Sequence, residues 1–377
     1  MIGYCGKQNG IKSIFDKRQD RELLDTSKFL GGEVFTMLSV ALDNRGAGTD
    51  AGEFGRVPLP VMDDSFDRVS AHKPEWKLME SGPVFSAYQL EQPLADTTVR
   101  QRLVVWNGIP RLDCWVGLQD FNGKLWREFR MALPLAQEKP RIAYEVPMGV
   151  VEIGKDEIPT TGGHAYGDLT YSDQCRDIHP RMVQDFVDSS DARGGLTMSS
   201  SVSVFDWIDP TTTAPGKPVL QPVLLASRKS CNGEGNWYPQ AGDHGYLFTL
   251  TTHQGDWRNG YRDGIGANNH LRWIMAKPSG TAVLPAEKSF ASVSAGNVII
   301  STIKKCEDDD SIVARLYDIA GRDATATLTL FQPINDAEQC NIIEEEADKS
   351  LPVTKGAVEI PVGRNAIETI KVRVEAK

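Results

Sequence analysis

The apolar residues of this chain recur at every second position over most of its length. In residues 111–119, Leu112, Cys114, Val116 and Leu118 alternate with more polar neighbours, and residues 370–374 repeat the pattern. A period of two places one face of a strand on a core and the other face in water, which is typical of antiparallel sheets. The sequence therefore predicts an all-β protein. Capped amphipathic helices of three or more turns are not apparent in it.

A second alternating run makes a prediction about charged side chains. Phe129, Met131 and Leu133 fall on one face of an expected strand, and Glu128 and Arg130 fall on the other. If only one face is buried, the apolar residues lie in the core and both charged residues lie in water.

Glycine pairs mark the expected turns between these strands. Asn-Gly and Asp-Gly tolerate the positive φ angles of tight hairpins, so each pair is a candidate link between two strands. The clearest of them, Asn122–Gly123, lies directly between two alternating runs and predicts a hairpin. The pairs are Asn9–Gly10, Asn107–Gly108, Asn122–Gly123, Asn232–Gly233, Asn259–Gly260 and Asp263–Gly264.

A loop rich in proline and glycine divides the chain. Residues 277–289 include Pro278, Gly280 and Pro285, and the alternating pattern restarts after them. We therefore predict a large antiparallel β super-sandwich over residues 1–284 and a smaller β-sandwich domain over residues 285–377.

Composition and charge restrict the partners. Hydrophobic residues make up 40% of the 377 residues, which is enough for a sizeable core. The net charge of -10 would repel phosphate backbones, so no nucleic acid partner is expected. No apolar stretch approaches the roughly 20 residues needed to span a bilayer, and no signal peptide is apparent. We expect no membrane partner, and a cytoplasmic location if Met1 is the natural start.

Residues that could carry catalysis are not arranged in a recognisable motif. The histidines form no His-x-Asp or His-Glu-x-x-His pair, and the six cysteines form no Cys-x-x-Cys pair, so we expect no metal site and no catalytic residue in this chain. Buried thiols are the favoured interpretation of the cysteines, with one or two disulfides as the alternative in an exported protein. The glycines of Gly264-Ile265-Gly266 lack the third glycine of a dinucleotide fingerprint, and we expect no strand–helix unit around them.

Two predicted loops combine aromatic rings with charged groups. Sugars have apolar C–H faces and rings of hydroxyls, so carbohydrate sites tend to pair a flat aromatic with hydrogen-bonding charges. The alternative is that the tryptophans pack in the core and that the carboxylates form structural ion pairs. The candidates for carbohydrate contact are Asp206, Trp207, Asp209, His253, Asp256, Trp257 and Arg258.

The order of several segments resembles that of a known family. These segments are residues 10–17 with 22–25, 111–113, 126–135, 186–188 with 194–197, 253–257, and 303–308 with 313–317. Together they are similar to the C-terminal β-region of glycoside hydrolase family 38, the retaining α-mannosidases. The resemblance implies a super-sandwich of the galactose-mutarotase type with a small β-domain appended.

The resemblance also implies that the reactive centre lies elsewhere. In this family the zinc ligands and the aspartate nucleophile belong mainly to an N-terminal α/β barrel, to which nothing in this chain corresponds. The chain then resembles the non-catalytic β-half of an α-mannosidase, as a fragment or as one product of a split gene. Its expected partners are that catalytic barrel and a mannoside substrate, and zinc is expected in the barrel and not in this chain.

Two other functions are alternatives. The aromatic and carboxylate loops would also suit a stand-alone carbohydrate-binding module. A mutarotase-like or lyase-like enzyme of the same fold would need a histidine and a carboxylate that converge in a cleft, and His164, His244 and His253 are the candidates.

Overall fold

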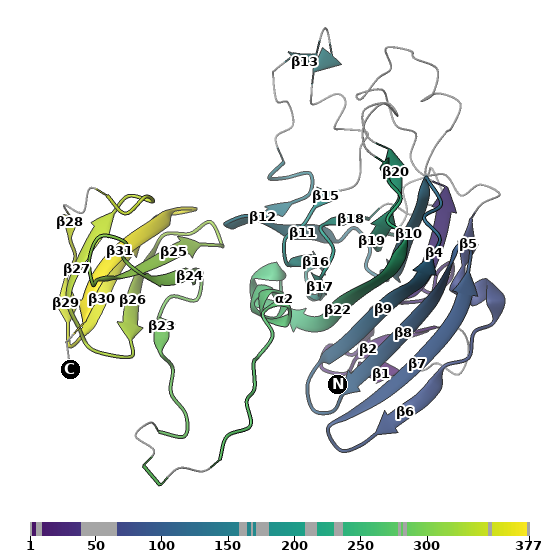
Figure 1. Ribbon diagram of the computed structural model, residues 1–377, viewed down its shortest axis with the longest axis horizontal. Helices are drawn as coiled ribbons and strands as arrows, with labels where there is room; N and C mark the ends of the chain where they lie inside the picture. Colours follow the sequence, from purple (N-terminus) through teal and green to yellow (C-terminus); the bar gives the residue numbers. More distant parts are fainter. Residues whose placement is uncertain are drawn as a thin grey trace. The chain divides into compact units, whose positions relative to one another are not determined.

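The computed structural model describes residues 2–4, 10–38, 66–157, 164–166, 169–170, 181–207, 217–229, 237–277, 280–281, 285–345 and 349–374 (Figure 1). For residues 2–4, 164–166, 169–170 and 228–229 only the course of the backbone is described. The chain divides into two compact units. We call Met1–Glu145 with Val151–His270 the N-terminal unit, and Val146–Val150 with Leu271–Lys377 the C-terminal unit. The domain boundary expected after residue 284 stays a prediction.

Two large antiparallel sheets form the N-terminal unit. Within the described residues, one sheet has nine strands in the order β12 (Gly149–Glu152), β11 (Arg141–Val146), β16 (Phe186–Ser190), β17 (Gly194–Ser200), β22 (Gly242–Gln254), β9 (Arg111–Phe121), β8 (Thr97–Trp106), β7 (Phe85–Leu94) and β6 (Lys77–Ser81). The other sheet, counted over the same residues, has six strands in the order β15 (Arg181–Met182), β18 (Val204–Asp206), β19 (Val219–Ala226), β10 (Arg127–Pro134), β4 (Glu33–Leu38) and β5 (Asp67–Arg68).

Shorter elements complete this unit. They are the sheet β1 (Ile2–Tyr4), β2 (Ile14–Asp16) and β3 (Arg21–Glu22), the pairs β13 (His164–Tyr166) with β14 (Leu169–Thr170) and β20 (Arg228–Lys229) with β21 (Trp237–Tyr238), the 3-10 helices η2 (Val69–His72) and η4 (Trp257–Asn259), and the helix α2 (Tyr261–Asn268). Strands β2 and β3 pair antiparallel, which brings together the segments 10–17 and 22–25 that contribute to the family resemblance.

The two large sheets pack face to face through side chains that the alternation places inward. Phe121 of β9 meets Phe129 of β10 edge-on, with 5.5 Å between the ring centroids. Tyr144 of β11 lies 5.4 Å from the ring of Phe205 in β18. Leu112, Cys114, Val116 and Leu118 are all nearly fully buried. These contacts confirm the all-β sandwich and the period-two prediction for β9.

The pair Asn122–Gly123 does not close a hairpin. It follows β9, which belongs to the nine-stranded sheet as described, and it precedes β10, which belongs to the six-stranded one. The predicted hairpin is therefore wrong, because the positive φ of Gly123, 79°, turns the chain from one layer to the other. By contrast, Asn107–Gly108 does join two paired strands, β8 and β9.

Strand β10 also departs from the prediction that one of its faces lies in water. All eight of its residues are buried, including Glu128 and Arg130. Because β10 is a central strand that pairs with both β4 and β19, and its polar face is covered, its charged side chains satisfy each other inside the protein. Their ion pair is described below.

A short helix follows β22, where the sequence predicted strand-to-strand turns and no strand–helix unit. Asn259–Gly260 lies between η4 and α2, and Asp263–Gly264 lies within α2. The two turn predictions are wrong because Gly260 and Gly264 serve close packing, and the expectation of no strand–helix unit is wrong because α2 follows β22. A β-carbon on Gly264 would lie 2.6 Å from the β-carbon of Phe186 in β16.

The two glycines inside α2 should therefore respond oppositely to alanine. We expect Gly264→Ala to destabilise the N-terminal unit by about 1–3 kcal/mol, because the added methyl group meets Phe186. Gly266 is exposed with open space around its α-carbon. Gly266→Ala should stabilise the protein by up to about 1 kcal/mol through helix propensity. Urea denaturation of both variants checks this, and equal effects would contradict the described packing.

The C-terminal unit is a smaller sandwich. Within the described part of this unit, one sheet has the order β23 (Ala291–Val293), β26 (Ala324–Leu330), β30 (Ala357–Val362) and β29 (Val353–Thr354), and the other has the order β24 (Val298–Lys305), β25 (Ile312–Asp318), β31 (Ile367–Val374), β27 (Ile334–Cys340) and β28 (Lys349–Ser350). One apolar cluster joins the two sheets and includes Leu316, Leu328, Ile360 and Ile370.

The structure tests the other sequence predictions only in part. Cys114, Cys306 and Cys340 are buried free thiols, as favoured, and the other three cysteines lie outside the described residues. Residues 307–310 lie in the hairpin connection between the paired strands β24 and β25. Of the helices in the described part of the chain, none is long and apolar enough to cross a membrane.

Candidate functional site

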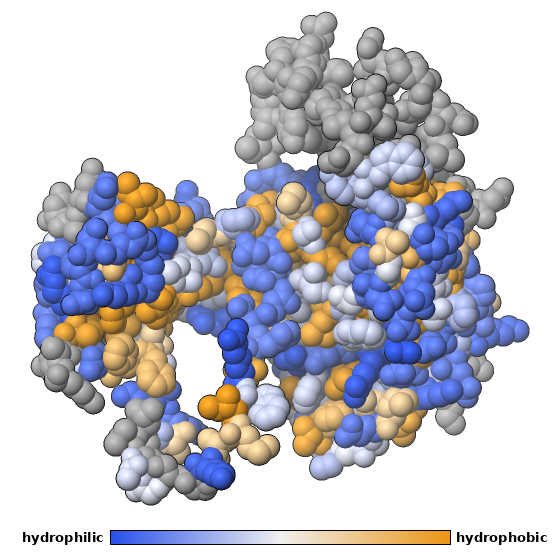
Figure 2. All heavy atoms as spheres, viewed as in Figure 1, coloured by the Kyte–Doolittle hydropathy of each residue, from blue (hydrophilic) through white to orange (hydrophobic). Residues whose placement is uncertain are grey.

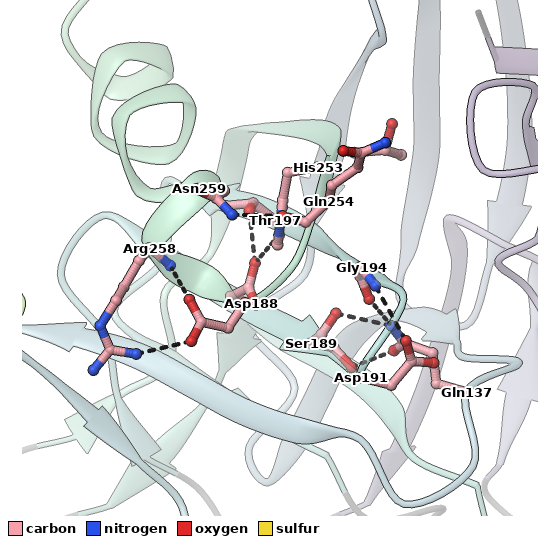
Figure 3. Close-up of polar contacts among 12 residues, drawn as sticks. Gln137, Asp188, Ser189, Asp191, Gly194, Thr197, His253, Gln254, Arg258 and Asn259 are labelled. Carbon is pink, nitrogen blue, oxygen red and sulfur yellow. Dashed lines mark hydrogen bonds and ion pairs between the residues drawn. The ribbon is translucent and has the colours of Figure 1, made fainter.

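The last residue but one of strand β22 is a histidine that forms a buried ion pair. His253 is 6% exposed, and its Nε2 lies 2.6 Å from Oδ2 of Asp188, which is inaccessible to solvent (Figure 3). The hydroxyl of Thr197 donates to the same carboxylate oxygen at 2.7 Å. The other ring nitrogen, Nδ1, lies 3.3 Å from the carbonyl oxygen of Gln254. Both ring nitrogens therefore have partners, and the ring is held in one orientation.

The register of three neighbouring strands brings these residues together. Asp188 on β16 lies opposite Thr197 on β17, and Gly195 on β17 lies opposite His253 on β22. A β-carbon on Gly195 would come within 2.7 Å of the imidazole, and one on Gly260 would come within 2.6 Å of it. The two glycines thus leave the space that the imidazole fills.

Electrostatics favour the protonated form of His253. Burial alone would lower the pKa of His253, but the hydrogen bond and the negative charge of Asp188 outweigh it and raise that pKa above its ordinary value. The resulting imidazolium–carboxylate pair stabilises the folded state fully below the unfolded-state pKa of about 6.5, and this contribution is lost as the pH rises through the folded pKa. Within the described residues, the second carboxylate oxygen of Asp188 has no hydrogen-bond partner.

The residues after β22 form a compact turn. The Asp256 carboxylate accepts a hydrogen bond from the backbone of Arg258 at 3.1 Å and pairs with its guanidinium at 2.9 Å. That guanidinium lies over the Trp257 ring, 4.5 Å from its centroid. Trp257 is only 5% exposed and packs edge-on against Tyr261. Its faces are therefore occupied, whereas the side chains of Asp256 and Arg258 are partly exposed.

Side chains of the hairpin formed by β2 and β3 donate hydrogen bonds to the same region. Arg18 donates from Nη2 to the carbonyl oxygen of Thr252 at 2.6 Å, and the side-chain amide of Gln19 donates to the carbonyl oxygen of His253 at 2.8 Å. Arg21 donates to both carboxylate oxygens of Asp191 at 2.9 Å. Residues more than 160 positions apart in sequence are thus tied together at the end of β22.

The second candidate loop begins in the six-stranded layer. Asp206 is buried, and its Oδ2 accepts a hydrogen bond from Nη1 of Arg130 at 3.1 Å. Arg130 also donates to Glu128 at 2.5 Å and to the side chain of Gln221 at 3.0 Å. Burial would lower the pKa of Arg130, but the two carboxylates outweigh it and raise that pKa. The guanidinium is therefore a permanent buried cation between two acids.

Trp207 differs from Trp257, the other candidate tryptophan, because it is partly exposed. The guanidinium of Arg181 lies 5.2 Å from the centroid of its indole, and its ring also meets that of Phe205. A flat aromatic beside a cation is an arrangement that suits a sugar. Asp209 lies outside the described residues.

The structure thus assembles the sequence candidates in two separate layers. His253, Asp256, Trp257 and Arg258 gather at the end of β22, and Asp206 and Trp207 lie at the end of β18. Carbohydrate contact by any of them stays a prediction.

Sequence patterns missed the partners of these candidates. The hydrogen bonds around the candidates involve Asp188, Thr197 and Arg130, and the sequence predicted none of these three as a site residue. The sequence does contain a sign that Arg130 is unusual, because it is a charged residue in the middle of a largely apolar run. The pairing of Asp188 with His253 has no such sign, because it depends on strand register.

Of the other two candidate histidines, only the side chain of His244 is described, and its hydrogen bond goes to a backbone carbonyl and not to an acid. His244 is half-buried, and its Nε2 lies 2.7 Å from the carbonyl oxygen of Gln240. The side chain of His164 lies outside the described residues. A search of the described residues finds no group of three or more His, Cys, Asp or Glu side chains placed to hold a metal ion.

A second buried acid gives a pH prediction. Glu145 is the last buried residue of β11 and is 3% exposed. Burial together with the negative charge of Asp185 raises the pKa of Glu145 to about 8. Because the unfolded value is near 4.5, the folded state retains a proton that the unfolded state loses, so stability falls as the pH rises between these values, by at most about 1.4 kcal/mol per pH unit. We expect Glu145→Gln to flatten this decline in urea denaturation between pH 5 and 8. An unchanged slope would contradict the buried acid.

Comparison with known proteins confirms the resemblance found in the sequence. Residues 297–370 match the model of the glycosyl hydrolases family 38 C-terminal beta sandwich domain. Alpha-mannosidase G from Dictyostelium discoideum is 30% identical over 110 residues, which are 28% of this chain and 10% of that protein.

Solved structures extend the similarity of fold over nearly the whole chain. An α-mannosidase from Enterococcus faecalis V583 matches 96% of this chain with a TM-score of 0.66 and 13% identity. A glycosyl hydrolase family 38 protein from Enterococcus faecalis matches 96% with a TM-score of 0.68 and 13% identity. This chain spans 40% and 42% of the lengths of those two chains, respectively.

Proposed function

We propose that this chain is the C-terminal β-region of a zinc-dependent, retaining α-mannosidase and supplies its scaffold, while the reactive residues belong to another part of the molecule. The main support is the match of fold over 96% of this chain to less than half of a family 38 structure. The family model that matches residues 297–370 describes the same C-terminal region. The partner of the chain is then an N-terminal catalytic barrel, which would hold the zinc.

The contacts at the end of β22 suit a supporting role. His253 and Asp188 are buried and paired, so they fix the end of the strand and are not presented to a substrate. The turn that follows presents the partly exposed Asp256 and Arg258. We propose that these two residues, and separately Trp207 with Arg181, contact the mannoside or the rim of the cleft that holds it.

An assay of the isolated chain tests the proposal. The purified chain should give no turnover of an aryl α-mannoside, with or without added zinc, beyond that of a heat-killed sample. The complete protein that contains this chain should hydrolyse the same substrate and lose activity to a chelator. Turnover by the isolated chain would refute the scaffold role, and a complete protein inactive on α-mannosides would refute the parent activity.

One observation supports a carbohydrate-binding module as the second candidate. Trp237 and Tyr238 of β21 are adjacent and exposed to 57% and 49%. Exposed aromatics of this kind stack on sugar rings. Calorimetry of the isolated chain with mannosides and mannan discriminates this alternative, since a scaffold alone should show no heat of binding at millimolar sugar.

A further inference from the structure

The connection between α2 and β23 contains the most exposed apolar residues of the described chain. Leu271, Trp273, Ile274 and Met275 are 97%, 81%, 87% and 91% exposed. The segment from 271 to 277 is neither helix nor strand (Figure 1). In Figure 2, apolar atoms stand out along this thin connection. We call residues 271–277 the apolar strap.

The sequence of the strap is that of a buried strand. In an extended chain, Leu271, Trp273 and Met275 share one face, and Ile274 points to the other. Burying a large apolar side chain is worth about 1.5–3 kcal/mol relative to leaving it in water. Four such residues within positions 271–275 are therefore costly to expose, and an exposed apolar patch of this kind marks an interaction site.

Within the described residues, the backbone of the strap also has no hydrogen-bond partner. Among the hydrogen bonds found for the described residues, none involves a backbone group of residues 271–277. If such a segment becomes extended, its open N–H and C=O groups and its apolar face are suited to pairing with the edge of a sheet.

We propose that the apolar strap docks as an added strand on the catalytic part of the parent protein. This inference rests on the proposed function. The family 38 structures that share this fold extend well beyond the matched region, because this chain covers only 40–42% of them. The matched domain model is C-terminal, so the remaining polypeptide precedes this region. That polypeptide is the occupant to which the proposal commits.

The small size of the strap favours this occupant over a second copy of the chain. A stable complex between separate chains buries about 1,200–2,000 Å². A strand of seven residues offers much less. A short strand suffices within one polypeptide or one permanent assembly, because the tether supplies a high effective concentration.

Hydrogen exchange followed by mass spectrometry tests the docking. The protein purified intact from its natural source is compared with this chain expressed alone. We expect the amides of residues 271–277 to exchange at least about 100-fold more slowly in the intact protein than in the isolated chain, because only the former provides a partner strand. Equal exchange rates in the two samples would overturn the proposal.

Two variants sharpen the test. The double substitution Trp273→Ser with Met275→Ser should abolish the protection in the complete protein, while the melting temperature of the isolated chain stays unchanged because both side chains are exposed there. Arg272→Ser, on the opposite face of the same extended segment, is the matched control and should retain the protection. If the double variant remains as protected as the control, the apolar face does not dock.

The outcomes separate this inference from the proposed function. A complete protein that hydrolyses α-mannosides but shows an unprotected strap refutes the docking alone. A protected strap in a protein without mannosidase activity supports the docking and refutes the activity. If the isolated chain itself shows protection that grows with its concentration, and sedimentation finds a dimer, the occupant is a second copy and the proposal is wrong.

Discussion

Replacing Arg130 with methionine is expected to destabilise the N-terminal unit by about 3–5 kcal/mol, because removing one partner of a buried ion pair leaves an uncompensated charge. Arg130 is 2% exposed and contacts two carboxylates, Glu128 and Asp206, which are 3% exposed each. Methionine fills a similar volume without neutralising them. Two negative charges then remain in a medium that solvates them poorly. Equilibrium unfolding in urea measures the loss.

A surface pair provides the matched control. Arg100 bonds to Glu91 at 2.7 Å, but both side chains are more than a third exposed. Arg100→Met should therefore cost less than about 1 kcal/mol. The neutral triple variant Arg130→Met, Glu128→Gln and Asp206→Asn should be more stable than Arg130→Met alone, because it no longer buries unpaired charge. If the single Arg130 and Arg100 variants lose the same stability, the buried cation is not what holds β10 to β18.

Replacing Leu328 with alanine is expected to destabilise the C-terminal unit by about 2–5 kcal/mol. Leu328 lies on β26, is fully buried, and belongs to the apolar cluster between the two sheets. Its truncation removes apolar contacts and leaves a cavity that the surrounding strands fill only in part. Hydrogen exchange of the β26 and β30 amides measures the effect within this unit.

The neighbouring threonine is the control for this second change. Thr325 is on the same strand and is exposed. Thr325→Ala should therefore alter stability by less than about 0.5 kcal/mol. A Leu328 variant that exchanges as slowly as the Thr325 variant would contradict the assignment of β26 faces that both sequence and structure support.

The period-two pattern predicted the architecture because burial and strand geometry act locally. Leu112 and Val116 of β9 and Ile370 of β31 are buried as their alternation required. The pattern failed for β10, where Glu128 and Arg130 are buried by partners on other strands. The local sequence shows that Arg130 is charged. It does not show that Arg130 pairs with Asp206, which lies 76 positions further along the chain.

The candidate site shows the same limit. His253 and Asp256 were selected for their residue types beside a tryptophan. Their neighbours Asp188 and Thr197 could be identified only from the pairing of β16, β17 and β22. The turn prediction from Asn259–Gly260 failed for a related reason. Asn259–Gly260 has the sequence of a hairpin turn, but Gly260 is required because the imidazole lies against its α-carbon.

The strand order of the largest sheet has a consequence for how the protein is made. Strand β22, which ends at residue 254, lies between β17 and β9 and pairs with both. Until β22 has been synthesised, the sheet consists of two separate parts, one ending at β17 and the other at β9. The edge strand of each part then exposes unpaired backbone groups. Such edges bind to one another or to other nascent chains. We therefore expect refolding to be slow and sensitive to protein concentration, and chaperones to be needed most during synthesis of the stretch before β22.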